Sequence, residues 1–483
     1  MRTYVTLLVL CFALVGAAAG ADAAAPMTLF VDARDATHNI LHVKMEIPAQ
    51  PGPLTLVYPK WIPGEHGPTG PISSLAALRI TANGATVPWQ RDFVDFYAFH
   101  MDVPQGASTL DVSFDQLMTP QDPMATPNLM ILNWNRVLLY PGGSRSDDVS
   151  VVPSIELPAG WQFGTALAGA RRTGDTVAFD RVTLTTLVDS PLDAGRYFRR
   201  ITLLESAGYS NEIDIVADQP RDLDIAPGII QDYKNLIGET DALYGARHWS
   251  DYHFLLSLSD TIPFQGIEHH QSSDNRASDD YLTDADALKN APDLLPHEFS
   301  HSWNGKYRRP ADLTTPDYQQ PEKTDLLWVY EGLNQYLGDM LSFRSGLVDA
   351  AEYPEYLAHL YGQLDYEPGR LTTPLVDTTI SAPYLYLAPN DWASHRRTSG
   401  DFYTEGELVW LAADAIIRTR SHGARSLDDF VKAFDGQRTT PPMVVTYSRQ
   451  DVENALNAVQ RYDWSAFFQK YVYEVAPHPV ALG

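Results

Sequence analysis

Cysteine is almost absent from this 483-residue chain, which contains only Cys11. It lies in an apolar stretch, residues 4–15, behind a basic start. Small residues follow, with cleavage sites after Ala21 and Ala23, so we expect a removable signal peptide over residues 1–23. Its removal would leave no cysteine, which excludes a disulfide framework and thiol chemistry. We therefore expect an exported protein, either periplasmic or extracellular.

Basic residues are scarce beside acidic ones. The chain has 35 Lys and Arg against 61 Asp and Glu, a formal net charge of −26. Nucleic-acid binding needs clustered cations facing phosphates, so this balance argues against such a partner. Long apolar runs are also missing, and the run at residues 4–15 is short for a membrane anchor, which is the alternative to a signal peptide. We expect no stable membrane span after signal removal, and nothing in the sequence indicates an oligomeric state.

The first half of the chain carries strand signals. Residues 41–47 and 110–114 alternate apolar and polar side chains, which is typical of half-buried strands. Asn83 and Gly84 form a dipeptide that favours a tight hairpin turn. The sequence therefore predicts a β-rich, sandwich-like N-terminal domain over residues 24–214.

Residues 215–483 are predicted to form a second domain of mixed character. Helical spacing begins near residue 227, a strand is expected at 252–258, and the polar segment 271–280 is expected to be an exposed loop. This strand-containing part runs to about residue 290. Helices are then expected over 324–345, 353–366, 403–420, 426–435, 450–459 and 464–472. The fold class that follows is α+β and multidomain.

Residues 297–301 hold the parts of a zinc site. His297 and His301 are four residues apart, which places both imidazoles on one face of a helix. Glu298 lies one step round that helix and can point at a metal-bound water. Pro296 precedes the motif, and since proline suits the first turn of a helix, we expect the helix to begin there, with Asp293 near its N-terminal end.

A third metal ligand is available in Glu331, with 29 residues between it and His301. It lies in a predicted amphipathic helix, and Asn334 and Asp339 nearby are candidate partners for the zinc histidines. A hydrogen-bonded histidine pair and an ion-pairing Glu331 would be the structural alternative. Together, the three residues favour a metallohydrolase that binds one zinc ion per chain.

Other segments hold candidate substrate-binding and catalytic groups. Glu268, in the segment with Gly266, could hold a substrate ammonium by a charge-assisted hydrogen bond, although a structural loop acid is the alternative. Tyr403 could donate a hydrogen bond to a tetrahedral oxyanion, although one of 25 tyrosines more often serves packing. The basic residues within 303–310 are expected to pair with nearby carboxylates.

Taken together, these segments resemble the PDZ-associated glycyl aminopeptidase family, a branch of the gluzincin metallopeptidases. The 29-residue gap before the third ligand is the spacing of that family. The resemblance extends over nearly the whole chain after the signal peptide and is carried by residues 61–64, 266–269, 297–310, 328–332, 403–406 and 463–468.

The resemblance implies a β-rich N-terminal domain and a thermolysin-like, mainly helical catalytic domain. The implied activity is zinc-dependent removal of N-terminal glycine or alanine from peptides with a free N-terminus. The implied site consists of the zinc ligands His297, His301 and Glu331, the general base Glu298, the oxyanion donor Tyr403, and the substrate-binding residues Glu268 and Gly266.

Two features depart from the family pattern. Glu405 stands where the family commonly has lysine, which reverses a charge two residues from Tyr403. The chain ends at Gly483, where the family normally continues into a PDZ domain, so we expect that domain to be lacking. A thermolysin-type endopeptidase and a catalytically silent secreted binding protein on the same fold are the alternative functions.

Overall fold

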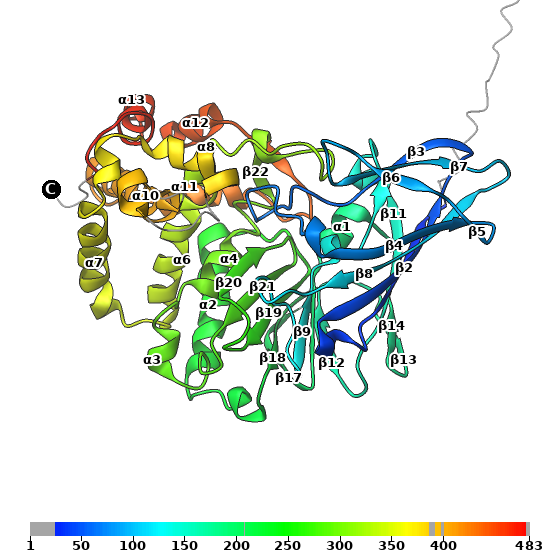
Figure 1. Ribbon diagram of the computed structural model, residues 1–483. Coiled ribbons are helices and arrows are strands. Elements are labelled where there is room, and N and C mark those ends of the chain that lie inside the picture. The colour runs from blue at the N-terminus through cyan, green and yellow to red at the C-terminus, as the bar shows by residue number, and fades with distance from the viewer. Residues whose placement is uncertain (1–24, 207, 386–391, 398–399, 480–483) are drawn as a thin grey trace, which may run out of the picture.

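The structure is a computed structural model that describes residues 25–206, 208–385, 392–397 and 400–479. The predicted signal peptide, with Cys11, lies outside these ranges. Figure 1 shows the blue and cyan N-terminal strands at one end of the molecule and the yellow to red helices at the other, with a green sheet between them. Within the described ranges, no helix has both the length and the apolar character that a membrane crossing requires.

The N-terminal region is built from three sheets. The largest has nine strands in the order β13-β14-β11-β1-β2-β8-β4-β5, with β15 also paired to β11. Its strands are β1 (Met27–Asp32), β2 (Ile40–Pro48), β4 (Leu75–Ala82), β5 (Ala85–Thr86), β8 (Thr109–Leu117), β11 (Ser150–Glu156), β13 (Arg171–Thr173), β14 (Thr176–Ala178) and β15 (Val182–Thr183).

Two smaller sheets complete this region. One contains β10 (Tyr140–Pro141), β3 (Gly52–Val57), β7 (Ala98–Val103) and β6 (Trp89–Arg91), and the other contains β12 (Gln162–Thr165), β16 (Leu192–Gly195) and β9 (Leu129–Leu132). The alternating strands predicted at 41–47 and 110–114 are β2 and β8, which pair antiparallel and bury every second side chain. Asn83 and Gly84 both have positive φ and join β4 to β5, as the hairpin prediction requires.

A five-stranded sheet links the two halves of the chain. Its order is β17-β18-β19-β21-β20, formed by β17 (Tyr197–Ser206), β18 (Tyr209–Ala217), β19 (Asp251–Leu258), β21 (Ser272–Ala277) and β20 (Gln265–Glu268). The predicted strand at 252–258 is β19. Sheet pairing joins β17 and most of β18, which the sequence assigned to the N-terminal domain, to strands of the following region. The domain limits at residues 214 and 215 stay a prediction.

The exposed loop expected at 271–280 is wrong for most of its length. Residues 272–277 form strand β21, and every one of them is buried between β19 and β20. Several of its polar groups have partners inside the protein: Arg276 pairs with Asp274, and the amide of Asn275 donates to Leu255 O at 2.9 Å. Polarity alone therefore gave the wrong prediction, since buried polar groups are tolerated where hydrogen bonds compensate them.

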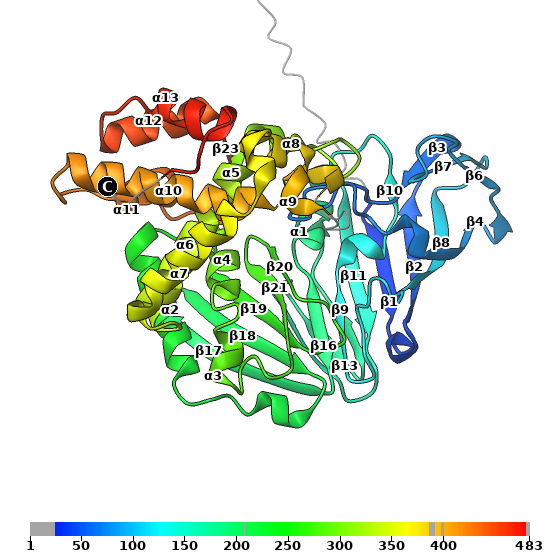
Figure 2. The same cartoon turned by 60° about the vertical axis from the view of Figure 1, so that its left-hand side comes forward.

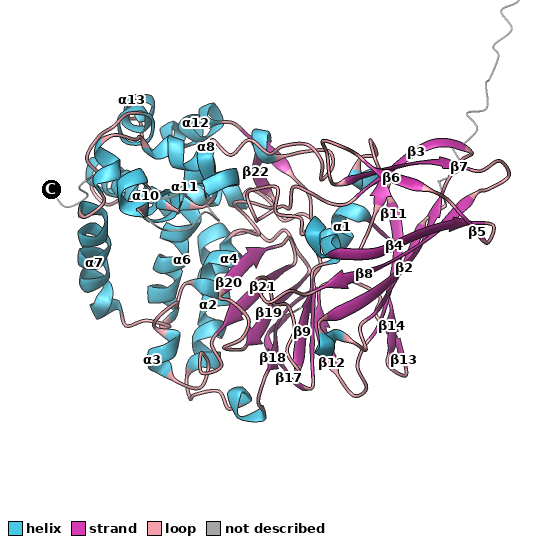
Figure 3. Cartoon of the chain, viewed as in Figure 1, coloured by secondary structure: helices cyan, strands magenta, loops and turns pink. Residues whose placement is uncertain are grey.

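The rest of the chain is mainly helical (Figure 3), so the predicted fold class is confirmed. A short parallel pair, β22 (Arg308–Pro310) and β23 (Val445–Tyr447), lies among the helices. The α-helices among the described residues are α1 (Leu184–Val188), α2 (Ile229–Tyr244), α3 (Ala285–Leu288), α4 (Leu294–Ser300), α5 (Leu327–Tyr330), α6 (Gly332–Ser345), α7 (Tyr353–Asp365), α8 (Leu375–Leu385), α9 (Ala393–Arg396), α10 (Asp401–Arg420), α11 (Leu427–Val431), α12 (Arg449–Val459) and α13 (Trp464–Phe468).

Helix α4 packs between the five-stranded sheet and the helical layer. It contacts β20 and β21 on one side and α6 on the other, and α10 packs on α6 (Figure 2). The predicted helix 324–345 is divided at Glu331, which ends α5 and precedes α6. The core beneath these elements is continuous from the sheet to α13.

Candidate active site

The His297–His301 motif lies at the end of a short buried helix. Asp293 is the N-cap residue of α4, and His297 N donates to Asp293 O at 2.7 Å. Pro296 falls in the first turn, where a missing N–H costs no hydrogen bond, as the sequence predicted. His301 is the C-cap residue, so both imidazoles project from one face of a single short helix.

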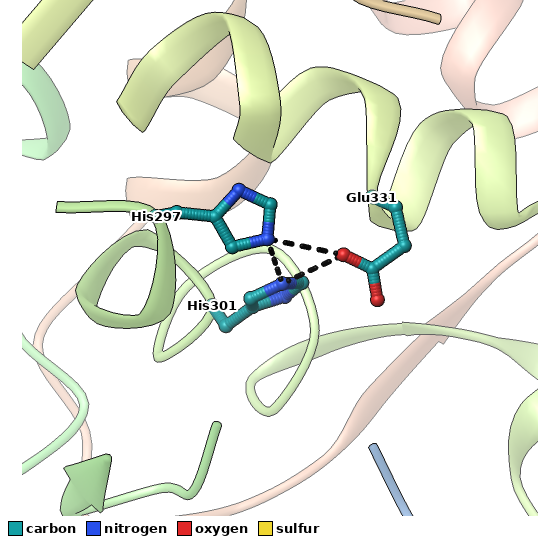
Figure 4. Close-up of side chains that lie close together, drawn as sticks. All are labelled: His297, His301 and Glu331. Atoms are coloured by element: carbon teal, nitrogen blue, oxygen red, sulfur yellow. Dashed lines mark hydrogen bonds and ion pairs between the residues drawn. The ribbon is translucent and has the colours of Figure 1, made fainter. Parts of the chain in front are cut away.

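The two histidines and Glu331 converge on one point (Figure 4). The Nε2 atoms of His297 and His301 are 3.0 Å apart. Glu331 Oε2 is 3.2 Å from the first nitrogen and 3.0 Å from the second. All three side chains are buried. The break between α5 and α6 therefore presents Glu331 directly to the helix that carries both histidines.

This triangle fits a zinc ion by donor type and by size. Two imidazole nitrogens and one carboxylate oxygen are a donor set of zinc hydrolases. Ligands at zinc distances and tetrahedral angles lie about 3.3 Å from one another, close to the three separations here. A three-residue set also leaves the fourth coordination position for water or substrate. His297, His301 and Glu331 would hold the metal.

Groups outside the triangle orient His301. Its Nδ1 lies 3.1 Å from the carbonyl oxygen of Asn304, to which it donates, and 2.6 Å from the side-chain amide of Asn334. Of the two partners named from the sequence, Asn334 thus contacts a histidine. Asp339 instead accepts hydrogen bonds from Gln335 at 3.0 Å and from Tyr356 at 2.6 Å.

Glu298 lies between the triangle and strand β20, with a carboxylate oxygen within 4.8 Å of a ring nitrogen of His301. Burial raises the pKa of its carboxyl well above the usual value, and the charges of Glu268 and Glu331 add to the rise. A Cβ on Gly266 would lie 2.2 Å from Glu298 Oε1, so any other residue at this position would displace the carboxylate. Gly266 therefore belongs to the site through its lack of a side chain.

Glu268 is a buried and ionised carboxylate. Its Oε1 accepts a hydrogen bond from the Tyr330 hydroxyl and lies 3.6 Å from Lys306 Nζ. Although burial acts in the opposite direction, Lys306 and the neighbouring histidines lower the pKa of Glu268 to about 2. Lys306 also lies 3.4 Å from Asp189, so this cation of the predicted basic cluster pairs with carboxylates as expected.

All the predicted site residues line one cavity of about 890 Å³. It lies where the N-terminal region, the five-stranded sheet and the helices meet. The predicted residues that line it are Gly266, Glu268, His297, Glu298, His301, Glu331 and Tyr403. The fold thus brings residues more than 130 positions apart in the sequence to the same cavity.

The charge of Glu405 is directed away from this cavity. Tyr403 lines the cavity from the first turn of α10, whereas Glu405, two residues on, is buried beneath that helix. Its carboxylate accepts hydrogen bonds from Arg370 at 2.9 and 3.2 Å and pairs with Arg397. Arg370 and Arg397 therefore compensate the negative charge that Glu405 introduces two residues from Tyr403.

His66 is a site residue that the sequence reading missed. It comes from the N-terminal region, is buried, and lies with its Nε2 atom 2.6 Å from Glu331 Oε1. The Tyr403 hydroxyl is 3.5 Å from the same nitrogen. The only signal was its position two residues after the segment 61–64, and 264 residues separate it from Glu331.

The fold is shared with solved aminopeptidase structures. An aminopeptidase N family protein from Idiomarina loihiensis superposes with a TM-score of 0.77 at 18% identity, covering 93% of this chain and 76% of that one. An M1 zinc metallopeptidase from Deinococcus radiodurans gives 0.55 at 15% identity over 94% and 95% of the chains. Legionella pneumophila aminopeptidase A gives 0.53 at 12% identity over 92% and 49%.

Sequence comparison leads to a family. No curated protein matches the chain. Residues 28–196 match the sequence profile of the Peptidase M61 N-terminal domain, and residues 290–409 match that of the M61 glycyl aminopeptidase. Together these matches span more than half of the chain and include both histidines, Glu331 and Tyr403. The chain belongs to the M61 glycyl aminopeptidase family and is a metallopeptidase.

Proposed function

We propose that this protein is a zinc-dependent aminopeptidase that removes small residues, glycine and alanine, from the N-termini of peptides. The observation that carries the proposal is the position of Glu268. Its ionised carboxylate lines the same cavity as Glu298 and the histidine–carboxylate triangle. An anion at that place can hold a substrate ammonium next to the reacting carbonyl, which restricts cleavage to the end of a chain.

Strand β20 offers a binding edge for the substrate backbone. It is the last strand of the five-stranded sheet, with β21 on one side only. An extended peptide can pair with such an edge through main-chain hydrogen bonds. Gly266 and Glu268 belong to this strand, so a peptide aligned along it would run past Glu298 and bring its N-terminus to Glu268.

The reaction follows from the groups in the cavity. Zinc, when bound by His297, His301 and Glu331, supplies a Lewis acid that polarises the scissile carbonyl and acidifies water. Glu298 accepts the proton of the attacking water and returns it to the leaving amine, a role suited to a carboxyl with a raised pKa. The Tyr403 hydroxyl donates a hydrogen bond to the developing oxyanion.

Gly64 forms part of the cavity wall next to Glu268. Gly64 faces the second carboxylate oxygen so closely that a Cβ there would lie 2.7 Å from Glu268 Oε2 and 3.0 Å from Ile267 Cγ2. Glycine at residue 64 therefore leaves the Glu268 carboxylate in the place where it can hold the substrate ammonium.

Export is part of the proposal. The segment over residues 1–23 has the order of a signal peptide, with a basic start, an apolar run and small residues. Mass spectrometry of the intact protein from the periplasm or medium tests it. A mature N-terminus at Asp22 or Ala24 is expected, and a full-length chain retained in the cytoplasm would contradict export.

Hydrolysis of glycyl, alanyl and leucyl chromogenic amides, beside their N-blocked versions, tests the activity. We expect chelator-sensitive cleavage of the free-amine glycyl and alanyl substrates only. Glu268→Gln should lower kcat/KM for these substrates by about 100-fold, since a charge-assisted bond is lost, while Glu352→Gln on the surface should change nothing. Cleavage of the blocked substrates would instead favour an endopeptidase. Inactivity of a folded, zinc-loaded protein would favour a binding protein.

A further inference from the structure

The two oxygens of the Glu331 carboxylate have separate partners. Oε2 faces the Nε2 atoms of His297 and His301 at 3.2 and 3.0 Å. Oε1 faces away from that pair and lies 2.6 Å from His66 Nε2. An N–H group on this nitrogen donates to the carboxylate oxygen. His66 therefore binds the Glu331 carboxylate on the side opposite to the proposed metal position.

His66 is itself held firmly. Its ring makes edge-on contacts with Tyr330 and Phe402, with centroid separations of 6.0 and 6.2 Å and interplanar angles of 88° and 83°. Its backbone is left-handed, with φ of 54°, a conformation that a residue other than glycine adopts only where the surroundings impose it. The imidazole thus has little freedom to leave Glu331.

The segment that carries His66 is anchored to the catalytic region. The amides of Lys60 and Trp61 both donate to Tyr318 O, at 3.0 and 2.9 Å. A bridge between Ile62 and Gly67 closes the turn around His66. These contacts make residues 60–67 part of the wall of the site although they belong to the N-terminal region.

We propose that His66 is a positioning residue through which the N-terminal region fixes Glu331 as a metal ligand. A hydrogen-bond donor on the second oxygen keeps a ligating carboxylate oriented toward the metal, and partners of this kind typically change metal affinity by 10–100-fold when removed. The inference rests on the zinc site of the proposed function. It adds that the N-terminal region supplies part of that site.

His66→Ala and His66→Gln test this assignment, because glutamine can present an N–H near the place of Nε2 whereas alanine cannot. His422→Ala is the matched control. His422 has the same φ of 54° but is exposed and lies after α10, so both variants place alanine at the same positive φ. Zinc affinity by chelator competition is the primary measurement, and the visible spectrum of the cobalt-substituted protein reports ligand geometry.

We expect His66→Ala to weaken zinc binding by about 10–100-fold and to alter the cobalt spectrum. His66→Gln should stay within about threefold of the wild type, and His422→Ala should match it. At saturating zinc, kcat of His66→Ala should fall while KM changes little, because the substrate contacts are intact.

Unchanged zinc affinity and cobalt spectrum in His66→Ala would overturn the inference. So would a His66→Gln variant as defective as the alanine variant, and this second variant decides the matter if His66→Ala does not fold. Zinc binding that depends on His66, in a protein that cleaves no free-amine peptide, would support this inference while overturning the proposed activity. Different results would therefore contradict the proposed activity and the proposed role of His66.

Discussion

Gly266 lies directly against the carboxylate of Glu298, so that a Cβ on residue 266 would stand 2.2 Å from Oε1. The only way to accommodate a methyl group there is to displace the Glu298 side chain. Gly266→Ala should therefore lower kcat by about 100-fold or more, the range that a misplaced general base costs. Zinc content should stay at the wild-type level, because the three ligands are not touched.

Gly362→Ala is the control for this variant. Gly362 lies in α7, and nothing stands within 4 Å of its potential Cβ. Alanine there should leave kcat unchanged and raise the free energy of unfolding by up to about 1 kcal/mol, the helix preference of alanine over glycine. A Gly266→Ala enzyme as active as Gly362→Ala would refute the close approach to Glu298.

Glu405 should matter for stability more than for catalysis. Glu405→Lys would install the residue common in the family, but it would place a third cation against Arg370 and Arg397. Removing one partner of a buried ion pair costs about 3–5 kcal/mol, so we expect a marked fall in the thermal midpoint.

Glu405→Gln should show a smaller fall in the thermal midpoint, since it adds no charge. Well below that midpoint, its kcat/KM should change far less than that of Tyr403→Phe, for which we expect a loss of about 100-fold. Activity measured beside differential scanning calorimetry separates the two effects. A Glu405→Lys protein that is as stable as the wild type and more active would contradict this role.

His253 predicts a pH dependence of stability. It is buried beside Asp214, at 2.7 Å, and near Asp251 and Glu212, with Arg200 on the same carboxylates. Burial lowers the pKa of His253, but the hydrogen bonds to Asp214 and Asp251 outweigh it and raise the pKa to about 9. A raised pKa stabilises the folded state fully below the unfolded-state value of about 6.5, and the effect disappears as the pH rises through 9.

Urea unfolding at pH 6 and at pH 9.5 measures this contribution. The wild type should exceed His253→Gln by about 3 kcal/mol at pH 6, and most of that difference should vanish at pH 9.5. His38→Gln, whose histidine is 77% exposed, is the control and should show no such change. An equal difference at both pH values would exclude a charged His253.

The cluster of His297, His301 and Glu331 could be predicted from the sequence because its signals are local. Two histidines four apart need only one helical turn, and Glu331 lies in the next strongly apolar helical segment, where α5 ends and α6 begins. The alternating strands β2 and β8 and the Asn83–Gly84 turn are local patterns of the same kind. Each is set by backbone periodicity, so a single sequence contains enough information.

The features that could not be predicted depend on long-range contacts. Strand β21 looked like a loop because its polar side chains find partners only after the sheet forms. His66 meets Glu331 only when the N-terminal region docks on the helices, and Arg370 and Arg397 meet Glu405 in the same way. No local sequence pattern predicts these pairings. They nevertheless determine that the charge of Glu405 is neutralised and that Glu331 is held in place.

The most direct test of the central claim combines zinc content with turnover in Glu298→Gln. Glu298 contacts none of the three proposed ligand atoms, so the variant should bind one zinc ion per chain with the affinity of the wild type. Its kcat on a glycyl amide should fall by at least about 1,000-fold, because no group remains to accept the proton of the attacking water. A zinc-loaded Glu298→Gln protein that retains substantial turnover would contradict the account, as would a wild type that hydrolyses the amide without zinc.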